Sequence, residues 1–300
     1  MFNRLLMLFF FGLSLILFTG VSASAQEAQN KIRVILIDGQ NNHDWRTTTP
    51  IMKKALEDCG RFTVDVSSNL KPNDKPGSIE KTVPFPPDLG NYDVLVSNYN
   101  GASWPAEFNK SLEAKLKEGK IALVIVHAAN NAFGNWNEYN LMIGMGWRPA
   151  NAGERLKLDD SGKPVREAKG EGLASGHRTK GVWKVTIRDG EHPITKGMPN
   201  EWMHTTDELY DNMRGPIQNI HLLATAYSTG TKAHEPMIWT IDYGKGRVFH
   251  TPMGHASEAM HCIGFTTTLQ RGTEWAATGK VTVKIPADFP TEEKTSSTTK

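Results

Sequence analysis

The hydrophobic pattern along the chain predicts buried strands that alternate with helices. Nearly unbroken runs of Ile, Leu and Val, in residues 32–38 and 121–126, are typical of strands buried on both faces of a sheet. Residues 49–60 and 105–118 have the pattern of helices, with apolar residues at helical spacing. Gly60 ends the first stretch and Gly119 follows the second. This alternation is typical of a doubly wound fold, so we expect an α/β domain with a mostly parallel sheet.

The second half of the chain gives weaker signals. Residues 237–242 and 247–253 flank Tyr-Gly-Lys-Gly, which predicts a C-terminal β-hairpin. Residues 148–180 are rich in Gly, Lys and Asp and lack apolar periodicity, so we interpret them as an insertion that could cover a site. The tail over residues 286–300 has few apolar side chains and is expected to be disordered. We see no internal repeat and expect one domain over residues 31–280.

The first 25 residues have the pattern of a secretory signal peptide. Arg4 precedes an apolar run over residues 5–18, which is short for a membrane span. Ala23-Ser24-Ala25 supplies the small residues of a cleavage site, so the mature chain is expected to begin at Gln26. An uncleaved anchor is the alternative. After cleavage we expect an exported protein, periplasmic or extracellular, without a membrane segment.

Composition and missing motifs exclude several function classes. A net charge of +2 argues against nucleic-acid binding, which needs a concentrated basic face. Cys59 and Cys262 have no neighbouring cysteine, so a cysteine metal site is not expected, and whether they pair is open. The chain also lacks the dinucleotide-binding glycine motif, the P-loop, the HExxH zinc motif and the serine-hydrolase elbow.

Four polar segments could converge on one crevice. They occupy residues 43–45, 127–131, 207–210 and 254–255, and three of them directly follow predicted strands. In an open α/β sheet, ligands bind at the carboxyl ends of the strands. Each segment alone is a weak signal, because any α/β protein has several polar loops, and the hypothesis depends on their similar character.

Histidine is the natural proton-transfer group near neutral pH, which suggests acid–base chemistry at these segments. The expected catalytic residues are His127, Glu208 and His255. The expected substrate-binding residues are His43, Asp44, Trp45, Asn130, Trp136 and Tyr210, in which the aromatic rings suit stacking on a sugar. Capping of helices and packing in the core are the structural alternatives for these residues. Several loop histidines could also bind zinc or another divalent ion, which the spacing leaves open.

Five segments in this order resemble the ThuA-like family, named for trehalose utilisation. They are GQNNHDWRTTTPIMKKALE, VIVHAANNAFGNWNEYNLMIG, EHPITKGMPNEWMHTTDELY, PMIWTIDYGKGRVFHTPMGH and EWAATGK, and the similarity covers about residues 31–278. The resemblance implies a flavodoxin-like fold of the class I glutamine-amidotransferase-like type. Amidotransferases of that fold place a cysteine nucleophile on the turn after a central strand. The corresponding turn here is Val126-His127-Ala128, so the resemblance implies that cysteine-based glutamine hydrolysis is lost.

The resemblance also implies carbohydrate catabolism, through trehalose and related disaccharides and their 3-keto derivatives. A ketone at C3 acidifies the hydrogen at C2, so removal of that proton can expel the aglycone without a glycosidase carboxylate pair. A His/Glu site suits this proton abstraction, and a divalent ion would stabilise the enolate. We therefore expect an enzyme that acts on a disaccharide or keto-sugar derivative. A non-catalytic carbohydrate-binding protein is the alternative, and the exact sugar and the oligomeric state stay open.

Overall fold

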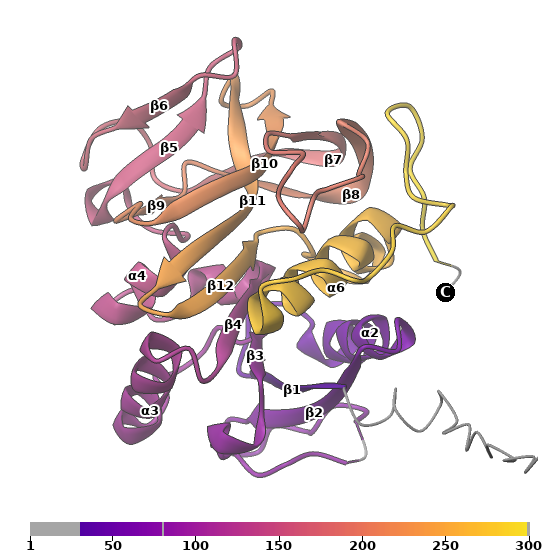
Figure 1. Cartoon of the computed structure of the whole chain (residues 1–300). Coiled ribbons are helices and arrows are strands. Elements are labelled where there is room, and N and C mark those ends of the chain that lie inside the picture. Colours follow the sequence, from indigo (N-terminus) through magenta and orange to yellow (C-terminus); the bar gives the residue numbers. More distant parts are fainter. Residues whose placement is uncertain (1–30, 80, 299–300) are drawn as a thin grey trace, which may run out of the picture. The chain divides into compact units, whose positions relative to one another are not determined.

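The computed structural model describes residues 31–79 and 81–298, and a mixed sheet of 12 strands runs through it (Figure 1). The predicted signal peptide lies outside the described residues. In the described part of the chain, none of the helices has the length and apolar content needed to cross a bilayer. The main path of the sheet has the strand order β2-β1-β3-β4-β12-β11-β10-β7-β8.

The first five strands of this path are parallel. They are β2 (Phe62–Asn69), β1 (Ile32–Gly39), β3 (Val94–Ser97), β4 (Ala122–Val126) and β12 (Gly246–Thr251). Strands β3 and β4 are buried at every residue, as expected for strands covered on both faces. The chain pairs β2 on one side of β1 and then β3 on the other, so the strand order reverses beside β1, where α/β folds place their ligands.

Helices cover both faces of this parallel half (Figure 1). On one face α2 (Trp45–Asp58) and α6 (Ile263–Thr278) bury their apolar side chains in one core cluster. On the other face α3 (Ala106–Lys117) and α4 (Asn137–Ile143) pack into a second cluster. The remaining short helices are η1 (Leu89–Asn91), η2 (His127–Asn131), η3 (Ala150–Ala152) and α5 (Ser257–Met260). Two cores separated by one sheet confirm the predicted α/β, doubly wound class, although the sheet as a whole is mixed rather than mostly parallel.

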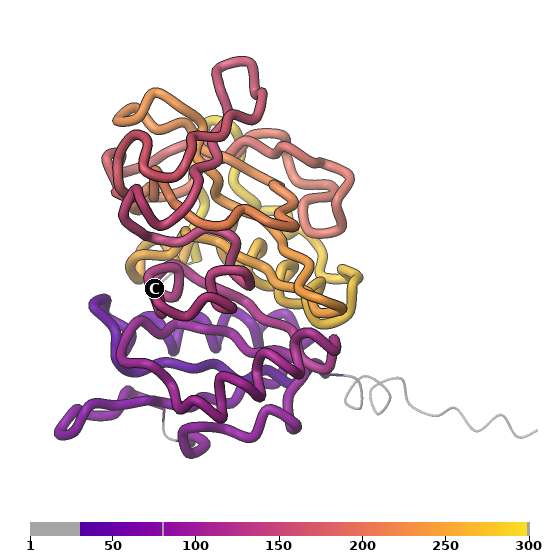
Figure 2. Tube along the Cα trace, turned by 90° about the vertical axis from the view of Figure 1, so that its left-hand side faces the viewer, coloured from indigo at the N-terminus to yellow at the C-terminus, as the bar shows by residue number. Residues whose placement is uncertain are grey.

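Beyond β12 the sheet is antiparallel, and Figure 2 shows this later part of the chain, in salmon and orange, above the indigo and purple first strands. Its strands on the main path are β11 (Ala233–Tyr243), β10 (Ile220–Ser228), β7 (Gly176–Ile187) and β8 (Glu201–Asp211). The pairing of β11 with β12 confirms the predicted hairpin. The stretch interpreted as an insertion becomes β5 (Glu154–Leu158), β6 (Pro164–Glu167) and the start of β7, and β5 also pairs with β9 (Arg214–Gly215).

Two local expectations need correction. The first helix begins at Trp45 rather than near residue 49, because the Asp44 side chain accepts hydrogen bonds from the backbone N–H and the hydroxyl of Thr47. Pro50 therefore lies inside α2 rather than at its first position. Residues 207–210 belong to strand β8, so helix capping does not explain Asp207 and Glu208.

The prediction of disorder over residues 286–300 is wrong for the described part of that tail, which ends at residue 298. Phe289 is 8% exposed and packs edge-on against Trp202, with ring centroids 5.5 Å apart. The backbone N–H of Ile263 donates to the carbonyl of Ser296 at 2.9 Å. One buried aromatic ring and backbone pairing hold a segment that composition alone would leave unfolded.

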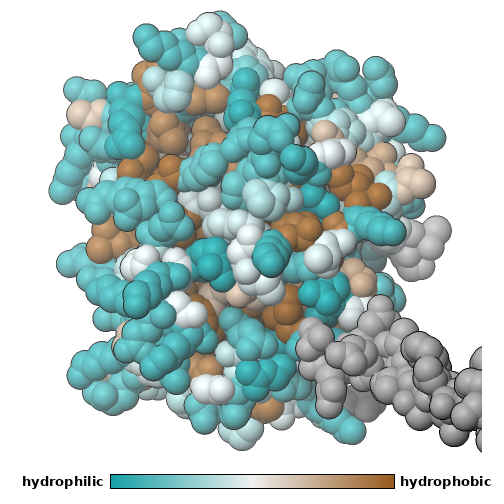
Figure 3. All heavy atoms as spheres, viewed as in Figure 1, coloured by the Kyte–Doolittle hydropathy of each residue, from teal (hydrophilic) through white to brown (hydrophobic). Residues whose placement is uncertain are grey.

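The outer surface is predominantly polar on the face shown in Figure 3, where apolar side chains occur in small groups. The large apolar side chains that are most exposed are Leu173, Val182 and Tyr227, which belong to three separate segments. This scattered arrangement is typical of a water-exposed domain surface.

Candidate functional site

Three histidines and one glutamate come together where parallel strands end. His43 follows β1, His127 follows β4, His255 follows β12, and Glu208 lies on β8. One nitrogen of each imidazole and one carboxylate oxygen all lie within 4.8 Å of one another. The structure thus brings together one residue from each of the four segments that the sequence singled out.

His127 enters the cluster from a strained turn. It begins η2 directly after β4 with φ of +34° and is 1% exposed. For a residue with a Cβ, this left-handed region costs about 1–2 kcal/mol. Its Nδ1 lies 2.7 Å from the carbonyl oxygen of Pro252, which can only accept a hydrogen bond, so the proton of the neutral ring is on Nδ1. The Nε2 lone pair therefore faces the cluster, and the hydrogen bond to Pro252 holds the ring in this orientation.

His43 is oriented in the same way by an amide. Its Nδ1 lies 3.0 Å from Oδ1 of Asn41, while Nδ2 of Asn41 donates to the carbonyl of Asn98 at 3.0 Å. The second contact fixes which end of the amide is the oxygen, so Nδ1 of His43 carries the proton. Nε2 of His43 is left with a lone pair, and it lies 3.3 Å from Nε2 of His127.

His255 and Glu208 complete the cluster on its more open side. Nδ1 of His255 is 3.2 Å from Nε2 of His127 and 3.1 Å from a carboxylate oxygen of Glu208. The His255 side chain is 37% exposed, and the Glu208 side chain is 14% exposed. Nζ of Lys180 binds the other Glu208 oxygen at 2.9 Å, and Nε2 of His177 lies 3.6 Å from it. The region predicted to cover a site therefore supplies two of its polar side chains.

Burial keeps the two inner imidazoles neutral. Desolvation, with the nearby rings of His127 and His255, lowers the pKa of His43 to about 3. Desolvation also lowers the pKa of His127 to about 4, although the charge of Asp207 opposes it. Neutral rings with lone pairs directed inward can accept a proton or bind a cation.

A buried carboxylate positions the loop that carries His255. Asp207 accepts hydrogen bonds from Nε2 of His204 at 2.8 Å, from the backbone N–H of Gly254 at 2.8 Å and from that of His255 at 3.0 Å. Burial raises the pKa of Asp207, but these donors outweigh it and hold the pKa below its usual value. The sequence pointed to this segment for Glu208, whereas the positioning role of Asp207 depends on contacts that no sequence pattern shows.

Tyr210 joins the cluster as a hydrogen-bond donor rather than as an exposed platform. Its ring is 1% exposed, and its hydroxyl lies 3.0 Å from Nε2 of His127. Burial raises the pKa of Tyr210, so the hydroxyl keeps its proton. The half-buried ring of Trp147 contacts Tyr210 edge-on at 4.7 Å between centroids and His177 at 5.4 Å. Trp147 was not predicted.

The other predicted binding residues have structural roles. Asp44 caps α2, and Trp45 is only 3% exposed, so it presents almost no free face to a sugar. Trp136 stacks on Tyr139, with ring centroids 5.5 Å apart, and donates from Nε1 to Glu113 at 2.7 Å. For these two tryptophans the packing alternative holds.

Asn130 is fully buried beneath the cluster. Its Oδ1 accepts from the backbone N–H of Trp147 at 2.6 Å, and its Nδ2 lies 2.9 Å from Nε2 of His250. These contacts hold Trp147 in place and give Asn130 no free polar atom for a substrate.

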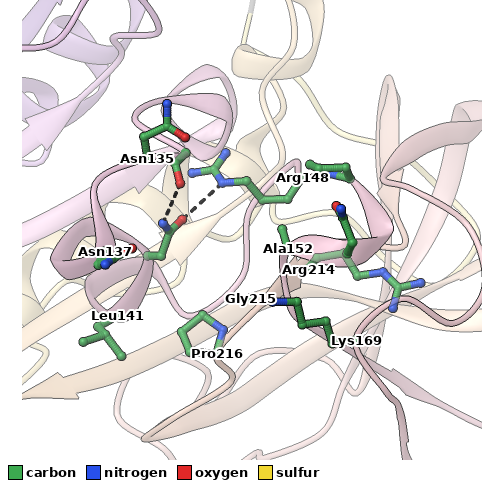
Figure 4. Close-up of a pocket in the computed structure, with 13 residues that line it drawn as sticks. Asn135, Asn137, Leu141, Arg148, Ala152, Lys169, Arg214, Gly215 and Pro216 are labelled. Carbon is green, nitrogen blue, oxygen red and sulfur yellow. Dashed lines mark hydrogen bonds between the residues drawn. The ribbon is translucent and has the colours of Figure 1, made fainter.

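A separate polar cavity of about 540 Å³ lies beside α4 (Figure 4). Arg148, Arg214 and Lys169 line it with Asn135 and Asn137, and none of the clustered histidines does. The guanidinium of Arg148 is occupied by the backbone carbonyls that follow His127. This cavity is therefore separated from the histidine cluster by the turn that carries His127.

Most of the chain is similar to one known protein family. The family model described as "ThuA: Trehalose utilisation" matches residues 33–276. The chain belongs to the ThuA family. This confirms the resemblance indicated by the five sequence segments, and the glutamine-amidotransferase-like fold of ThuA proteins agrees with the doubly wound sheet.

Two solved structures described as ThuA-like proteins are similar to this ThuA-family chain. The first, from Parabacteroides merdae, is 41% identical with a TM-score of 0.80, and the alignment covers 89% of this chain and 98% of that one. The second, from Bacteroides uniformis, is 16% identical with a TM-score of 0.53 and supports the fold alone, with 84% of this chain and 93% of that one covered. No match was found among curated proteins.

Proposed function

We propose that this ThuA-family protein is an exported carbohydrate-processing enzyme that acts on a disaccharide or keto-sugar derivative. One observation carries the proposal: neutral imidazoles and a carboxylate converge at the carboxyl ends of the parallel strands. The family name supports a carbohydrate substrate. The signal-peptide pattern of the first 25 residues supports export.

The proposed reaction begins with removal of the C2 proton of a 3-keto-glycoside. The electrons of the C–H bond form an enolate with the C3 ketone, and the C1–O bond then breaks. The products are an unsaturated keto-sugar and the aglycone, whose oxygen takes up a proton. His127 or His255 would accept the C2 proton, and Glu208, 3.1 Å from His255, would hold the imidazolium that forms.

The alternative is a carbohydrate-binding protein without chemistry. Such proteins depend mainly on exposed aromatic rings and amides. Here Trp45 is buried, and Asn130 has no free polar atom. These placements favour the enzyme, although Trp147 and Tyr210 leave an aromatic wall beside the cluster.

Deuterium exchange tests the proposal directly. The mature protein is incubated in D2O with 3-keto-glucosides and a 3-keto disaccharide, and NMR follows both C2 and the free aglycone. We expect deuterium at C2 of recovered substrate or release of the aglycone, because both require the same proton abstraction. The matching glycosides with a C3 hydroxyl serve as the substrate control and should not react, since their C2 hydrogen is not acidified.

If none of the keto-glycosides exchanges deuterium at C2 or releases its aglycone, the enzyme proposal is contradicted. Saturable sugar binding in the same samples would then favour the carbohydrate-binding alternative. His221→Ala is the matched protein control, because this exposed histidine on β10 pairs with Asp189 and belongs to no part of the cluster. It should behave as the unmodified protein does.

A further inference from the structure

We propose that His43, His127, His255 and Glu208 bind one divalent transition-metal ion. The donors would be Nε2 of His43, Nε2 of His127, Nδ1 of His255 and the Glu208 carboxylate. Three features support this site: the spacing of the donor atoms, the positions of the imidazole protons, and the metal preference of three nitrogens with one carboxylate.

Three of the distances between the donor atoms match a shared central ion, and all four donor atoms lie within 4.8 Å of one another. The two histidine Nε2 atoms are 3.3 Å apart, Nδ1 of His255 is 3.2 Å from the nearer one, and the Glu208 oxygen is 3.1 Å from Nδ1. Two ligands that are each about 2.0–2.1 Å from a tetrahedral zinc are about 3.4 Å apart. The three imidazoles are also nearly perpendicular to one another, with interplanar angles of 79°, 85° and 88°, so they approach one another without stacking.

Proton positions provide the second, independent observation. The Nδ1 protons of His43 and His127 are donated to Asn41 and to the carbonyl of Pro252. Two lone pairs therefore face each other across 3.3 Å, which is repulsive unless an electrophile lies between them. Metal-binding histidines nearly always donate their other N–H to a carbonyl, an amide oxygen or a carboxylate, as both of these do.

The Tyr210 hydroxyl offers a competing explanation for one of these atoms. It can donate to Nε2 of His127, from which it lies 3.0 Å. It does not explain the contact of His43. Among the described residues, the hydrogen-bonding neighbour of its Nε2 is Nε2 of His127, which also carries a lone pair. In the loaded site the Tyr210 hydroxyl would turn its proton elsewhere and remain beside the ion.

The donor set selects the class of metal. Three imidazole nitrogens and one carboxylate suit Zn²⁺ and neighbouring first-row ions such as Co²⁺ and Ni²⁺. Mg²⁺ and Ca²⁺ prefer oxygen ligands throughout, so we expect neither to compete. The partial exposure of His255 leaves one side of the site open to a substrate oxygen.

The catalytic meaning of this ion rests on the proposed function, whereas its binding does not. When bound, such an ion supplies Lewis-acid stabilisation of the enolate oxygen of a keto-sugar. The ligand nitrogens are then no longer free to accept a proton. His177, whose Nε2 lies 3.6 Å from Glu208, is the neighbouring base on the exposed side.

Metal stoichiometry tests the inference without any sugar. Untagged mature protein is stripped with a chelator, dialysed, reloaded with Zn²⁺ or Co²⁺, freed of excess ion and analysed by mass spectrometry for metal. We expect one ion per chain, visible cobalt absorption bands typical of a low-coordinate nitrogen site, and no retention of Mg²⁺ or Ca²⁺. His43→Ala and His255→Ala should each weaken zinc binding by about 100-fold or more, which exceeds the usual effect of losing a residue behind a ligand.

His221→Ala is the control variant and should retain one ion, because its side chain is remote from the cluster. Thermal unfolding of each metal-free variant checks its fold. Substitution of a partly exposed ligand such as His255 should change the unfolding temperature little. A chain that retains no ion after reloading, or equal zinc affinity in all three variants, would overturn the inference. The proposed function can fail separately from metal binding. If the metal-loaded protein shows no C2 exchange, metal binding stands and the proposed reaction is contradicted. If the metal-free protein exchanges deuterium at C2 as fast as the loaded protein, the reaction stands and the ion has no catalytic role.

Discussion

His127→Ala is expected to reduce C2 proton exchange on a 3-keto-glycoside by about 10²–10⁴-fold, the usual contribution of a positioned acid–base group. His127 is the innermost residue of the cluster, and both its neighbours in the set, His43 and His255, contact its Nε2. Its removal takes away either the base itself or a ligand of the proposed ion. The measurement is the deuterium incorporation rate at C2, compared with that of His221→Ala.

The fold should survive this substitution, because the variant loses only the ring's hydrogen bonds with Pro252 and Tyr210 and keeps a backbone conformation that costs alanine about as much as histidine. Circular dichroism and thermal unfolding check this point. A folded variant that exchanges deuterium at the unmodified rate would remove His127 from the mechanism. An unfolded variant would move the test to His255→Ala, whose side chain is more exposed.

Arg148→Met is expected to lower the free energy of unfolding by about 3 kcal/mol or more. It should also loosen the turn that positions His127, because Arg148 binds the carbonyls of that turn. The guanidinium is buried, and its hydrogen bonds go to the segment that follows His127, to α4 and to the residue before it in the chain. Its acceptors are the carbonyls of Asn130, Asn131, Ala132 and Trp147 and Oδ1 of Asn140. Hydrogen bonds to a charged group contribute about 1.5–3 kcal/mol each when the partner would otherwise stay buried and unpaired.

The measurement is denaturant-induced unfolding, in which the midpoint should fall while the slope stays constant. Arg33→Met is the matched control: Arg33 is 54% exposed and pairs with Asp93 at the surface, so its loss should cost less than about 1 kcal/mol. Equal midpoints for the two variants would show that the carbonyls after His127 do not depend on Arg148. The C2 exchange rate of the folded Arg148→Met variant then reports how well the turn positions His127 without the hydrogen bonds of Arg148.

The parallel half of the fold could be predicted because each of its signals is local. The apolar runs of β1 and β4 are long enough to identify buried strands, and the Gly-Lys-Gly turn identifies the hairpin. The site location followed from a general rule for the carboxyl ends of parallel strands. Three of the clustered residues, His43, His127 and His255, come directly from that rule.

The remainder depends on contacts between distant segments. Residues 207–210 were polar enough to be interpreted as a loop or helix start, but pairing with β7 makes them a strand that delivers Glu208 to the cluster. Trp147 has no periodic neighbour that would mark it, and its place beside Tyr210 depends on the backbone hydrogen bond to Asn130. Trp45 and Trp136 were the opposite case: their residue type suits sugar stacking, but tertiary packing uses both rings.

The cluster of three histidines and a glutamate is, in our proposal, the functional centre of the protein and the site of one metal ion. Anomalous diffraction from crystals of the cobalt- or zinc-loaded protein tests it most directly. We expect one strong peak per chain, bounded by Nε2 of His43, Nε2 of His127, Nδ1 of His255 and the Glu208 carboxylate. A loaded protein whose anomalous peak lies elsewhere, or whose cluster shows no peak, would contradict it.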